Sequence, residues 1–129
     1  MPWIYKQSTG LLSINYALFR VEIPGYSGFA EGKNNPAMQS VVGRGPIPQG
    51  WYTINAPQDK TELGPCALPL TPSAANKMFG RSDFWIHDDS LAHPGAASKG
   101  CIITTGVITR KLIDLLRTSI GANTLQVIP

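Results

Sequence analysis

The chain has 129 residues, a net charge of +3 and 43% hydrophobic residues. This length predicts one domain, residues 1–129, whose core is large enough to fold without disulfide bonds. The 11 basic residues are scattered and form no run of like charge, which argues against nucleic acid as a partner. The 13 glycines and 11 prolines favour a mostly β fold with many turns over a helical bundle.

The first residues, Met1–Lys6, lack a basic segment followed by a long apolar core, so we expect no Sec signal peptide. No apolar run approaches the ~18 residues of a transmembrane helix, so we expect no membrane insertion. The chain is therefore expected to be made in the cytoplasm, and action outside the cell would require separate export. Cys66 and Cys101 lie in unlike contexts, and Cys101 is expected to be a free thiol.

The first half of the chain alternates strand patterns with glycine- and proline-rich turns. Pro24-Gly25 is expected to end the third strand, and Tyr26–Pro36 to form a long loop that is either functional or a permissive surface loop. The sequence leaves open whether this loop closes over a substrate. Residues 37–42 fit a turn or a short strand, and Gly45–Gly50 forms a rigid turn. The predicted strands are residues 3–7, 11–16, 18–23 and 51–54, the first two forming a hairpin.

The second half begins with a polar loop, residues 56–65. The prolines of the extended segment 67–72 are expected to confine it to a sheet edge, and residues 73–78 are expected to form one helical turn. Further strands are predicted at residues 83–87, 102–105 and 125–128.

One convincing helix follows the residues Thr105 and Gly106, with Gly121 as its expected stop. Its expected apolar face consists of Val107, Ile108, Leu112, Leu115 and Leu116. Its expected polar face consists of Arg110, Lys111, Asp114 and Arg117. The predicted fold class is therefore mostly β, with one main C-terminal helix.

Both histidines and one cysteine lie between His87 and Cys101, in a loop that joins two predicted strands. A cysteine nucleophile needs a base, and His87 is placed to take the thiol proton and return it to a leaving amine. Backbone N–H groups around Gly100 and Cys101 are candidates to stabilise an oxyanion. Lys99 adds positive charge that favours a thiolate, and Asp88 or an adjacent carboxylate is a candidate to orient the imidazole.

Two other interpretations compete with this one. A lone buried cysteine is usually an inert apolar residue, and a lone histidine at a strand end is usually a satisfied polar group. A metal site would use His87, Asp89, His93 and Cys101, but the spacing matches no compact zinc pattern and no second cysteine lies nearby. The combined pattern favours thiol chemistry with no metal and no cofactor, and it places His93 in the loop.

The motif His-X-X-Ser, followed by Pro-Gly-X-X-Ser-X-Gly-Cys, resembles the L,D-transpeptidase catalytic domain, and most of all its small branch of type VI secretion effectors. Trp3–Gly10 is similar to the opening hairpin of that branch. Gly25–Gly28 with Gly32–Pro36 is similar to its long loop. Gly45–Tyr52 is similar to the Pro-X-Gly-aromatic turn of the wider family.

The resemblance implies a β-rich sandwich or barrel with a catalytic cysteine in a cleft. The family attacks peptidoglycan tetrapeptide stems between the third residue, a meso-diaminopimelate, and the terminal D-alanine. The thioester formed on the cysteine then passes to water, to a free D-amino acid or to a neighbouring stem amine. The effector branch implies a secretion apparatus, a cognate immunity protein and action in the periplasm of target bacteria.

Two positions depart from the family pattern. The family usually has glycine where this chain has Asp88, and many relatives have histidine where it has Lys99. The resemblance implies that the backbone carbonyl of Asp88 still orients the imidazole, while the Asp88 side chain is a candidate to crowd the cleft or to alter the basicity of His87. The predicted catalytic residues are Cys101, His87, Ser98, Gly100 and Asp88. The predicted substrate-binding residues are Lys99, Asp89, Tyr26 and Ser90.

The leading prediction is a cysteine-dependent L,D-transpeptidase or L,D-carboxypeptidase that acts as a secreted antibacterial effector. Its partners would be peptidoglycan stems and D-amino acids. A thiol peptidase acting on protein substrates and a non-catalytic wall-binding module remain as alternatives.

Overall fold

The opening hairpin forms as its apolar pattern predicts, in a computed structural model that describes residues 2–129. β1 (Trp3–Lys6) pairs antiparallel with β2 (Leu11–Tyr16), and β2 pairs antiparallel with β3 (Phe19–Ser27). Trp3, Tyr5, Leu12 and Ile14 of the hairpin are buried in the main core. Alternate residues of each strand thus face the interior, as period-two patterning requires.

β3 continues past Pro24-Gly25, so the prediction that the strand ends there is wrong. Pro24 is the last β3 residue to pair with β2, and from Gly25 onward β3 pairs with β8 (Ile102–Thr104) instead. A Cβ at position 25 would lie 2.3 Å from the carbonyl oxygen of Ile103, so glycine permits this close pairing. The exchange of partners places Tyr26 in a strand beside β8 rather than in a loop. The predicted loop begins at Gly28 and contains two short 3₁₀ turns, Ala30–Gly32 and Pro36–Met38.

β6 (Gly64–Pro72) lies inside the sheet, so its predicted edge position is wrong. It pairs with β7 (Phe84–His87) on one side and with β4 (Gly50–Ile54) and β5 (Gln58–Lys60) on the other. The backbone of Pro69 faces the gap between β4 and β5, where its carbonyl accepts the N–H of Asn55 at 2.9 Å. The missing N–H of Pro69 therefore removes no ladder bond.

Two further predictions need correction. The polar loop 56–65 contains strand β5, which pairs with the start of β6. Residues 73–78 form a hydrogen-bonded turn, with the Asn76 N–H donating to the carbonyl of Ser73, and no helix. Both segments are short and polar, so their own sequence does not determine their secondary structure. Pairing with β6 makes part of the first segment a strand, and one backbone hydrogen bond makes the second a turn.

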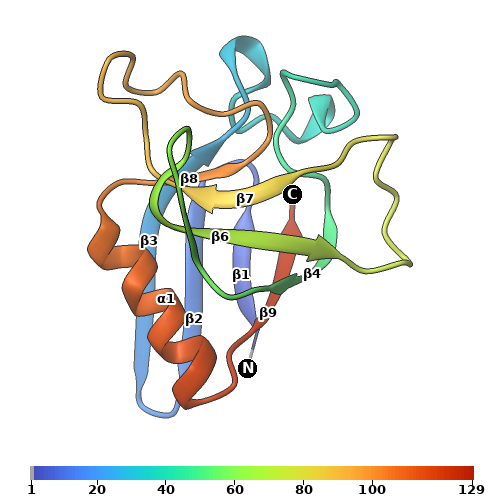
Figure 1. Cartoon of the computed structure of the whole chain (residues 1–129). Coiled ribbons are helices and arrows are strands. Elements are labelled where there is room, and N and C mark those ends of the chain that lie inside the picture. Colours follow the sequence, from blue (N-terminus) through green and yellow to red (C-terminus); the bar gives the residue numbers. More distant parts are fainter. Residues whose placement is uncertain (1) are drawn as a thin grey trace.

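Eight strands close into a barrel in the order β4-β9-β1-β2-β3-β8-β7-β6, with β6 returning to β4 and β5 added outside the ring (Figure 1). β9 (Thr124–Ile128) pairs parallel with β1, and β7 pairs parallel with β8. The fold is therefore mostly β, as predicted. No helix within residues 2–129 is long and apolar enough to cross a membrane.

α1 (Val107–Ser119) starts after Gly106 and stops before Gly121, as predicted, but its faces differ from the prediction. Arg110 is fully buried, whereas Ile108 is 74% exposed and Leu115 is 58% exposed. Ile113 and Leu116 are the residues that α1 buries in the core. Arg110 lies inward because backbone carbonyls surround its guanidinium, a contact set that a hydrophobic pattern cannot predict.

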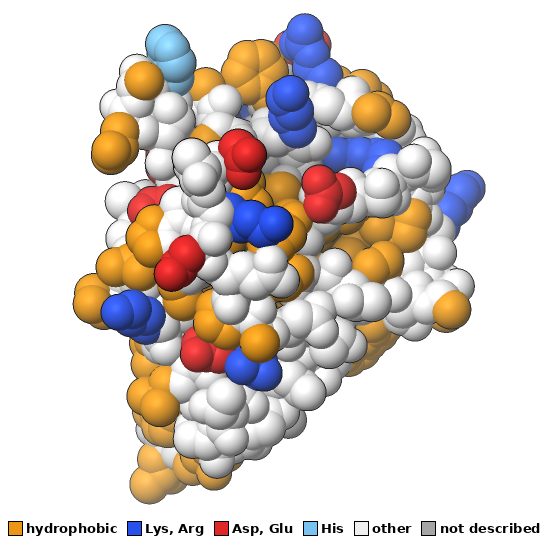
Figure 2. All heavy atoms as spheres, viewed as in Figure 1, with side chains coloured by type: hydrophobic (Ala, Val, Ile, Leu, Met, Phe, Trp, Pro, Cys, Tyr) orange, Lys and Arg blue, Asp and Glu red, His pale blue; other side chains and the backbone are white. Residues whose placement is uncertain are grey.

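The segment after β3 and the segment between β7 and β8 lie at the same end of the barrel (Figure 1). The face shown in Figure 2 carries basic and acidic side chains mixed with apolar ones, and no block of a single charge covers it. The barrel end therefore combines the sequence segments that hold most of the predicted site residues.

Candidate active site

The parallel pairing of β7 with β8 places His87 and Cys101 on the same face of the sheet. Ile86 pairs with Ile102, and both side chains are in the core. Cys101 lies directly before β8, and continuing the alternation of strand residues by one position projects it to the opposite face together with His87. The two residues are then two positions apart along the strand direction, or about 7 Å of rise. The loop between them returns the chain to the starting strand, as the sequence predicts.

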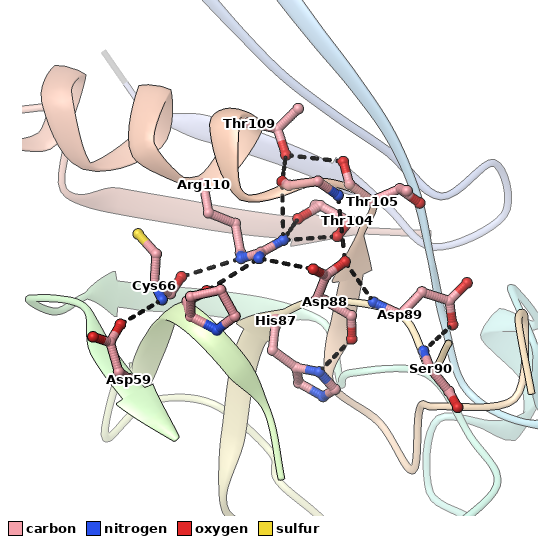
Figure 3. A network of polar contacts seen from close by, with 12 residues as sticks. Asp59, Cys66, His87, Asp88, Asp89, Ser90, Thr104, Thr105, Thr109 and Arg110 are labelled. Carbon is pink, nitrogen blue, oxygen red and sulfur yellow. Dashed lines mark hydrogen bonds and ion pairs between the residues drawn. The ribbon is translucent and has the colours of Figure 1, made fainter. Parts of the chain in front are cut away.

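The imidazole of His87 is buried and held by its own neighbour. Its Nδ1 lies 2.8 Å from the backbone carbonyl oxygen of Asp88 (Figure 3). A carbonyl oxygen has no proton to give, so Nδ1 carries the proton and the neutral ring keeps its lone pair on Nε2. The predicted contact between His87 and the Asp88 carbonyl is therefore confirmed, and it leaves Nε2 as the basic atom.

Burial lowers the pKa of His87 below its usual value, the Asp88 carbonyl contact raises it in part, and the positive charge of Arg110 lowers it again. Burial raises the pKa of the Cys101 thiol to about 11, although a backbone hydrogen bond from Trp85 lowers it in part. The resting pair at neutral pH is thus a neutral imidazole and a neutral thiol rather than an ion pair.

The sulfur and the imidazole point to different hollows. The Sγ of Cys101 lies 3.8 Å from the carbonyl oxygen of Asp83, and no hydrogen bond joins it to His87 within residues 2–129. Cys101 lines a hollow of about 320 Å³ with Arg81, Asp83 and Lys99, which we call the thiol pocket. A second hollow, of about 540 Å³, is the histidine pocket and is lined by His87, Asp88, Asp89, Ser90 and His93, among others. Proton transfer to Nε2 requires the Cys101 side chain to turn toward His87, a tightening that is common when substrate binds.

Asp88 points its carboxylate away from the imidazole, although the residue also lines the histidine pocket. Its Oδ2 accepts from Nη2 of Arg110 at 3.2 Å, and its Oδ1 accepts the N–H groups of Asp89 and Gly106 (Figure 3). The other N–H groups of Arg110 donate to carbonyl oxygens of Pro65, Cys66, Thr104 and Gly106. Asp88 thus ties the start of the loop to α1 with its side chain and holds His87 with its backbone.

Replacing Asp88 with asparagine is expected to lower the free energy of unfolding by about 1 kcal/mol, because a partly exposed ion pair is lost. Turnover is expected to stay within about threefold, since the carbonyl that holds His87 remains. Urea denaturation and a rate assay measure the two effects. Asp114→Asn, which removes the surface ion pair with Arg117, is the matched control. A tenfold rate loss at unchanged stability would instead place the Asp88 carboxylate in the chemistry.

Ser98 holds the turn before the nucleophile and does not reach the thiol. Its buried hydroxyl accepts the N–H groups of Gly28 and Gly100 and donates to the carbonyl of Cys101 at 2.6 Å. The Gly100 N–H is therefore already bonded, and the Cys101 N–H is the amide of this turn that Ser98 does not hold. Gly100 has φ +133°, and a Cβ there would lie 2.5 Å from Nη2 of Arg81, so only glycine fits.

Tyr26 and Asp89, both predicted to bind substrate, bind each other. The Tyr26 hydroxyl donates to Oδ1 of Asp89 at 2.6 Å and accepts the N–H of Ala97 at 2.9 Å. Burial opposes ionisation of Asp89, but bonds from Tyr26 and from the N–H groups of Gly95 and Ser90 leave its pKa below the usual value. The pair fixes the loop against β3. Ser90 accepts the N–H of His93, which is exposed in the loop as predicted.

Sequence reasoning missed three residues of this region. Arg81, Ser27 and Arg110 are buried polar residues that bridge segments far apart in the chain. The Ser27 hydroxyl donates to the carbonyl of Gly100 and accepts the N–H of Ile47. No local pattern marks an isolated arginine or serine for such a role, because its partners are backbone groups supplied by the fold. Both cysteines are free thiols, and no cluster of three potential metal ligands occurs within residues 2–129.

A family model described as the Tlde1 domain matches residues 21–125, which include most of β3, His87, Cys101 and all of α1. The chain belongs to the Tlde1 domain family. This family consists of type VI effectors with an L,D-transpeptidase-like domain, so the predicted resemblance is confirmed. No curated protein sequence matches this Tlde1 domain.

Solved structures resemble this Tlde1 domain in fold. Bd1075 from Bdellovibrio bacteriovorus is 14% identical with a TM-score of 0.58, over 98% of this chain and 47% of its own. An L,D-transpeptidase from Mycobacterium smegmatis is 10% identical with a TM-score of 0.58, over 99% of this chain and 58% of its own. The Tlde1 domain thus spans about half the length of these two proteins. Family and fold together support a peptidoglycan-related function of the L,D-transpeptidase type.

Proposed function

We propose that this protein is a cysteine-dependent L,D-transpeptidase or L,D-carboxypeptidase that acts on peptidoglycan tetrapeptide stems. The observation that carries the proposal is the placement of Cys101 and His87 on one face of two parallel strands, with Nε2 of His87 left basic by the Asp88 carbonyl. The Tlde1 family membership and the L,D-transpeptidase fold support the choice of substrate. Since β1, β2 and the end of β9 lie outside the matched range and complete the barrel, we infer that residues 1–129 act as one catalytic domain.

The first half-reaction forms a thioester. His87 takes the Cys101 proton on Nε2, and the thiolate attacks the carbonyl carbon of the third stem residue. The Cys101 N–H is the candidate donor to the resulting oxyanion. When this tetrahedral adduct collapses, the bond to the terminal D-alanine breaks, and the imidazolium returns its proton to the leaving amine.

The second half-reaction transfers the stem to an acceptor. His87 removes a proton from water or from the amine of a free D-amino acid, and the acceptor attacks the thioester carbonyl. The thiol leaves with the proton from His87, so the enzyme is regenerated. Water gives a trimmed tripeptide, whereas a D-amino acid gives an exchanged tetrapeptide. Neither half-reaction needs a metal or a cofactor.

We extend the proposal to the role in the cell, which the family membership supports. As a type VI effector, the protein is delivered into the periplasm of a target bacterium, where trimmed or exchanged stems no longer support normal crosslinking. A producing cell then needs an immunity protein against its own effector. The Tlde1 match supports both statements.

Product analysis with purified disaccharide-tetrapeptide tests the proposed function. We expect one D-alanine released per stem and, with an excess of a second free D-amino acid, a tetrapeptide that carries this residue in place of D-alanine. Chromatography with mass spectrometry measures both products. An unchanged muropeptide beside cleavage of an unrelated protein would instead indicate a general thiol peptidase. Sedimentation with cell-wall sacculi without any product would indicate a binding module.

A further inference from the structure

We propose that the thiol pocket is a carboxylate-binding subsite, in which Arg81 and Lys99 receive the terminal α-carboxylate of the residue that leaves. The inference rests on the proposed function and deepens it, because it names the part of the substrate that this pocket recognises. It begins from Arg81, which is 7% exposed and has no carboxylate partner within residues 2–129.

Arg81 is held entirely by neutral groups. Its Nη1 donates to the carbonyl oxygens of Gln39 and Pro46, and its Nη2 donates to those of Gly45 and Lys99. These bonds fix the guanidinium in place, but carbonyl dipoles do not cancel its unit charge. Its Nε–H has no acceptor among the described residues. A buried arginine is normally paired with an anion, so this one is short of a counter-charge.

The unpaired charge lies beside the nucleophile. Nη2 of Arg81 would be 2.5 Å from a Cβ at Gly100, the residue directly before Cys101, and both Arg81 and Cys101 line the thiol pocket. Burial lowers the pKa of Arg81, while Tyr52 and, to a smaller extent, Cys101 raise it again. An anion bound in this pocket supplies the missing counter-charge without displacing any existing bond.

The other charges of the pocket agree with an anionic ligand. Lys99 is exposed, lines the same pocket and enters no ion pair within residues 2–129, so its ammonium group is available to a ligand. The one carboxylate of the pocket, Asp83, accepts the indole N–H of Trp85 at 2.9 Å. Two cations and one tethered anion leave a net positive pocket, which attracts a single carboxylate.

The neighbouring histidine pocket has the opposite character. Its lining residues include the acidic Glu62, Asp88 and Asp89 but no lysine or arginine, and of the three only Asp88 is paired with an arginine within residues 2–129, Arg110. A substrate carboxylate is therefore repelled from the His87 side and attracted to the Cys101 side. In a tetrapeptide stem, only three bonds separate the scissile carbonyl carbon from the terminal carboxylate carbon. A carboxylate in the thiol pocket thus keeps the scissile carbonyl close to Sγ.

The contrast also specifies which part of the substrate the predicted substrate-binding residue Lys99 would contact. At this position the chain carries a flexible cation, which reaches a ligand as a point charge, next to a fixed guanidinium. Lys99 is therefore a specificity-determining residue for the terminal carboxylate, and Arg81 is the fixed charge that it supplements.

A pair of matched substrates tests the proposal: the tetrapeptide with a free terminal carboxylate and the same peptide with a terminal carboxamide. Wild type is expected to favour the carboxylate by about tenfold or more in kcat/KM, as for one charge-assisted contact. Lys99→Gln is expected to reduce this preference about threefold to tenfold, mainly through KM for the carboxylate, with little change for the carboxamide. Lys111→Gln, an exposed lysine of α1 outside the pocket, is the matched control and leaves the preference unchanged.

The outcomes separate this inference from the proposed function. If neither peptide is processed, the proposed function fails. If wild type processes both peptides at equal rates, or if Lys99→Gln slows both by the same factor, the carboxylate subsite is wrong while the enzyme activity stands. Arg81→Gln and Arg81→Lys provide a second measurement: where both are folded by thermal denaturation, the lysine variant is expected to keep more of the preference. Equal loss in the two folded variants would contradict a role for the charge.

Discussion

Replacement of Cys101 with alanine is expected to reduce D-alanine release from tetrapeptide stems to the background rate. In the proposed mechanism Cys101 supplies the bond-forming sulfur, and the other cysteine of the chain, Cys66, lies on β6. Without the thioester, neither hydrolysis nor exchange has an intermediate, so both products disappear together. The alanine variant is expected to fold, because the turn is held by Ser98 and by backbone groups rather than by Sγ.

Cys66→Ala is the matched control, since it removes the other free thiol of the chain. Cys66 is buried beside α1, and its backbone carbonyl, which the substitution retains, is the group that accepts from Arg110. We expect nearly full activity and a small loss of stability from the lost packing. Equal D-alanine release by wild type and Cys101→Ala would contradict a cysteine mechanism at Cys101. Loss of D-alanine release in Cys66→Ala alone would mean that Cys66, and not Cys101, is the nucleophile.

The strands were predictable where local pattern and tertiary pairing agree. The opening hairpin and the strands that hold His87 and Ile102 follow from alternating or β-branched residues, and the structure places them as predicted. The prediction failed at Pro24 and Pro69, because a proline ends a strand only where its N–H would be needed. In both cases the strand changes partners or faces a gap, and only the barrel topology reveals this.

The candidate site was also predictable where it depends on a local motif and unpredictable where it depends on the tertiary fold. The positions of His87 and Cys101 follow from a short motif at two strand ends, and the Asp88 carbonyl contact follows from the resemblance. The orientation of the Asp88 carboxylate could not be predicted, since it depends on Arg110, whose place on α1 the hydrophobic pattern assigned to the surface. Arg81 was missed for a related reason: its partners are backbone carbonyls from distant segments, and backbone groups leave no mark in a sequence.

Replacement of His87 with glutamine is expected to lower kcat/KM at pH 7 by about 10²–10⁴, the usual contribution of a positioned base. The pKa of His87 is lowered, so the wild-type base is neutral at pH 7 and is lost only as the pH falls through a value below 6.5. Wild-type kcat/KM should therefore fall on the acid side below pH 6.5. This acid limb should be absent in His87→Gln.

On the alkaline side, kcat/KM of His87→Gln should depend on pH in a different way from kcat/KM of wild type. Without a base, attack requires thiolate formed by the solvent, and the pKa of Cys101 is about 11. Residual activity of His87→Gln should therefore rise about tenfold for each pH unit toward pH 11, so its deficit relative to wild type narrows as the pH rises. A rate profile from pH 5 to 10 measures both limbs, with His93→Gln, an exposed loop histidine, as the matched control.

Two results would contradict this mechanism. An acid limb that persists in His87→Gln would assign the base to another residue. A flat alkaline profile in that variant would mean that Cys101 is already a thiolate without His87. In wild type the geometry argues against a thiolate–imidazolium ion pair, because Sγ faces the Asp83 carbonyl rather than the imidazole. In the proposed mechanism the thiol is activated only when substrate occupies the thiol pocket and the Cys101 side chain turns to Nε2. Formation of the nucleophile would then be coupled to recognition of the stem.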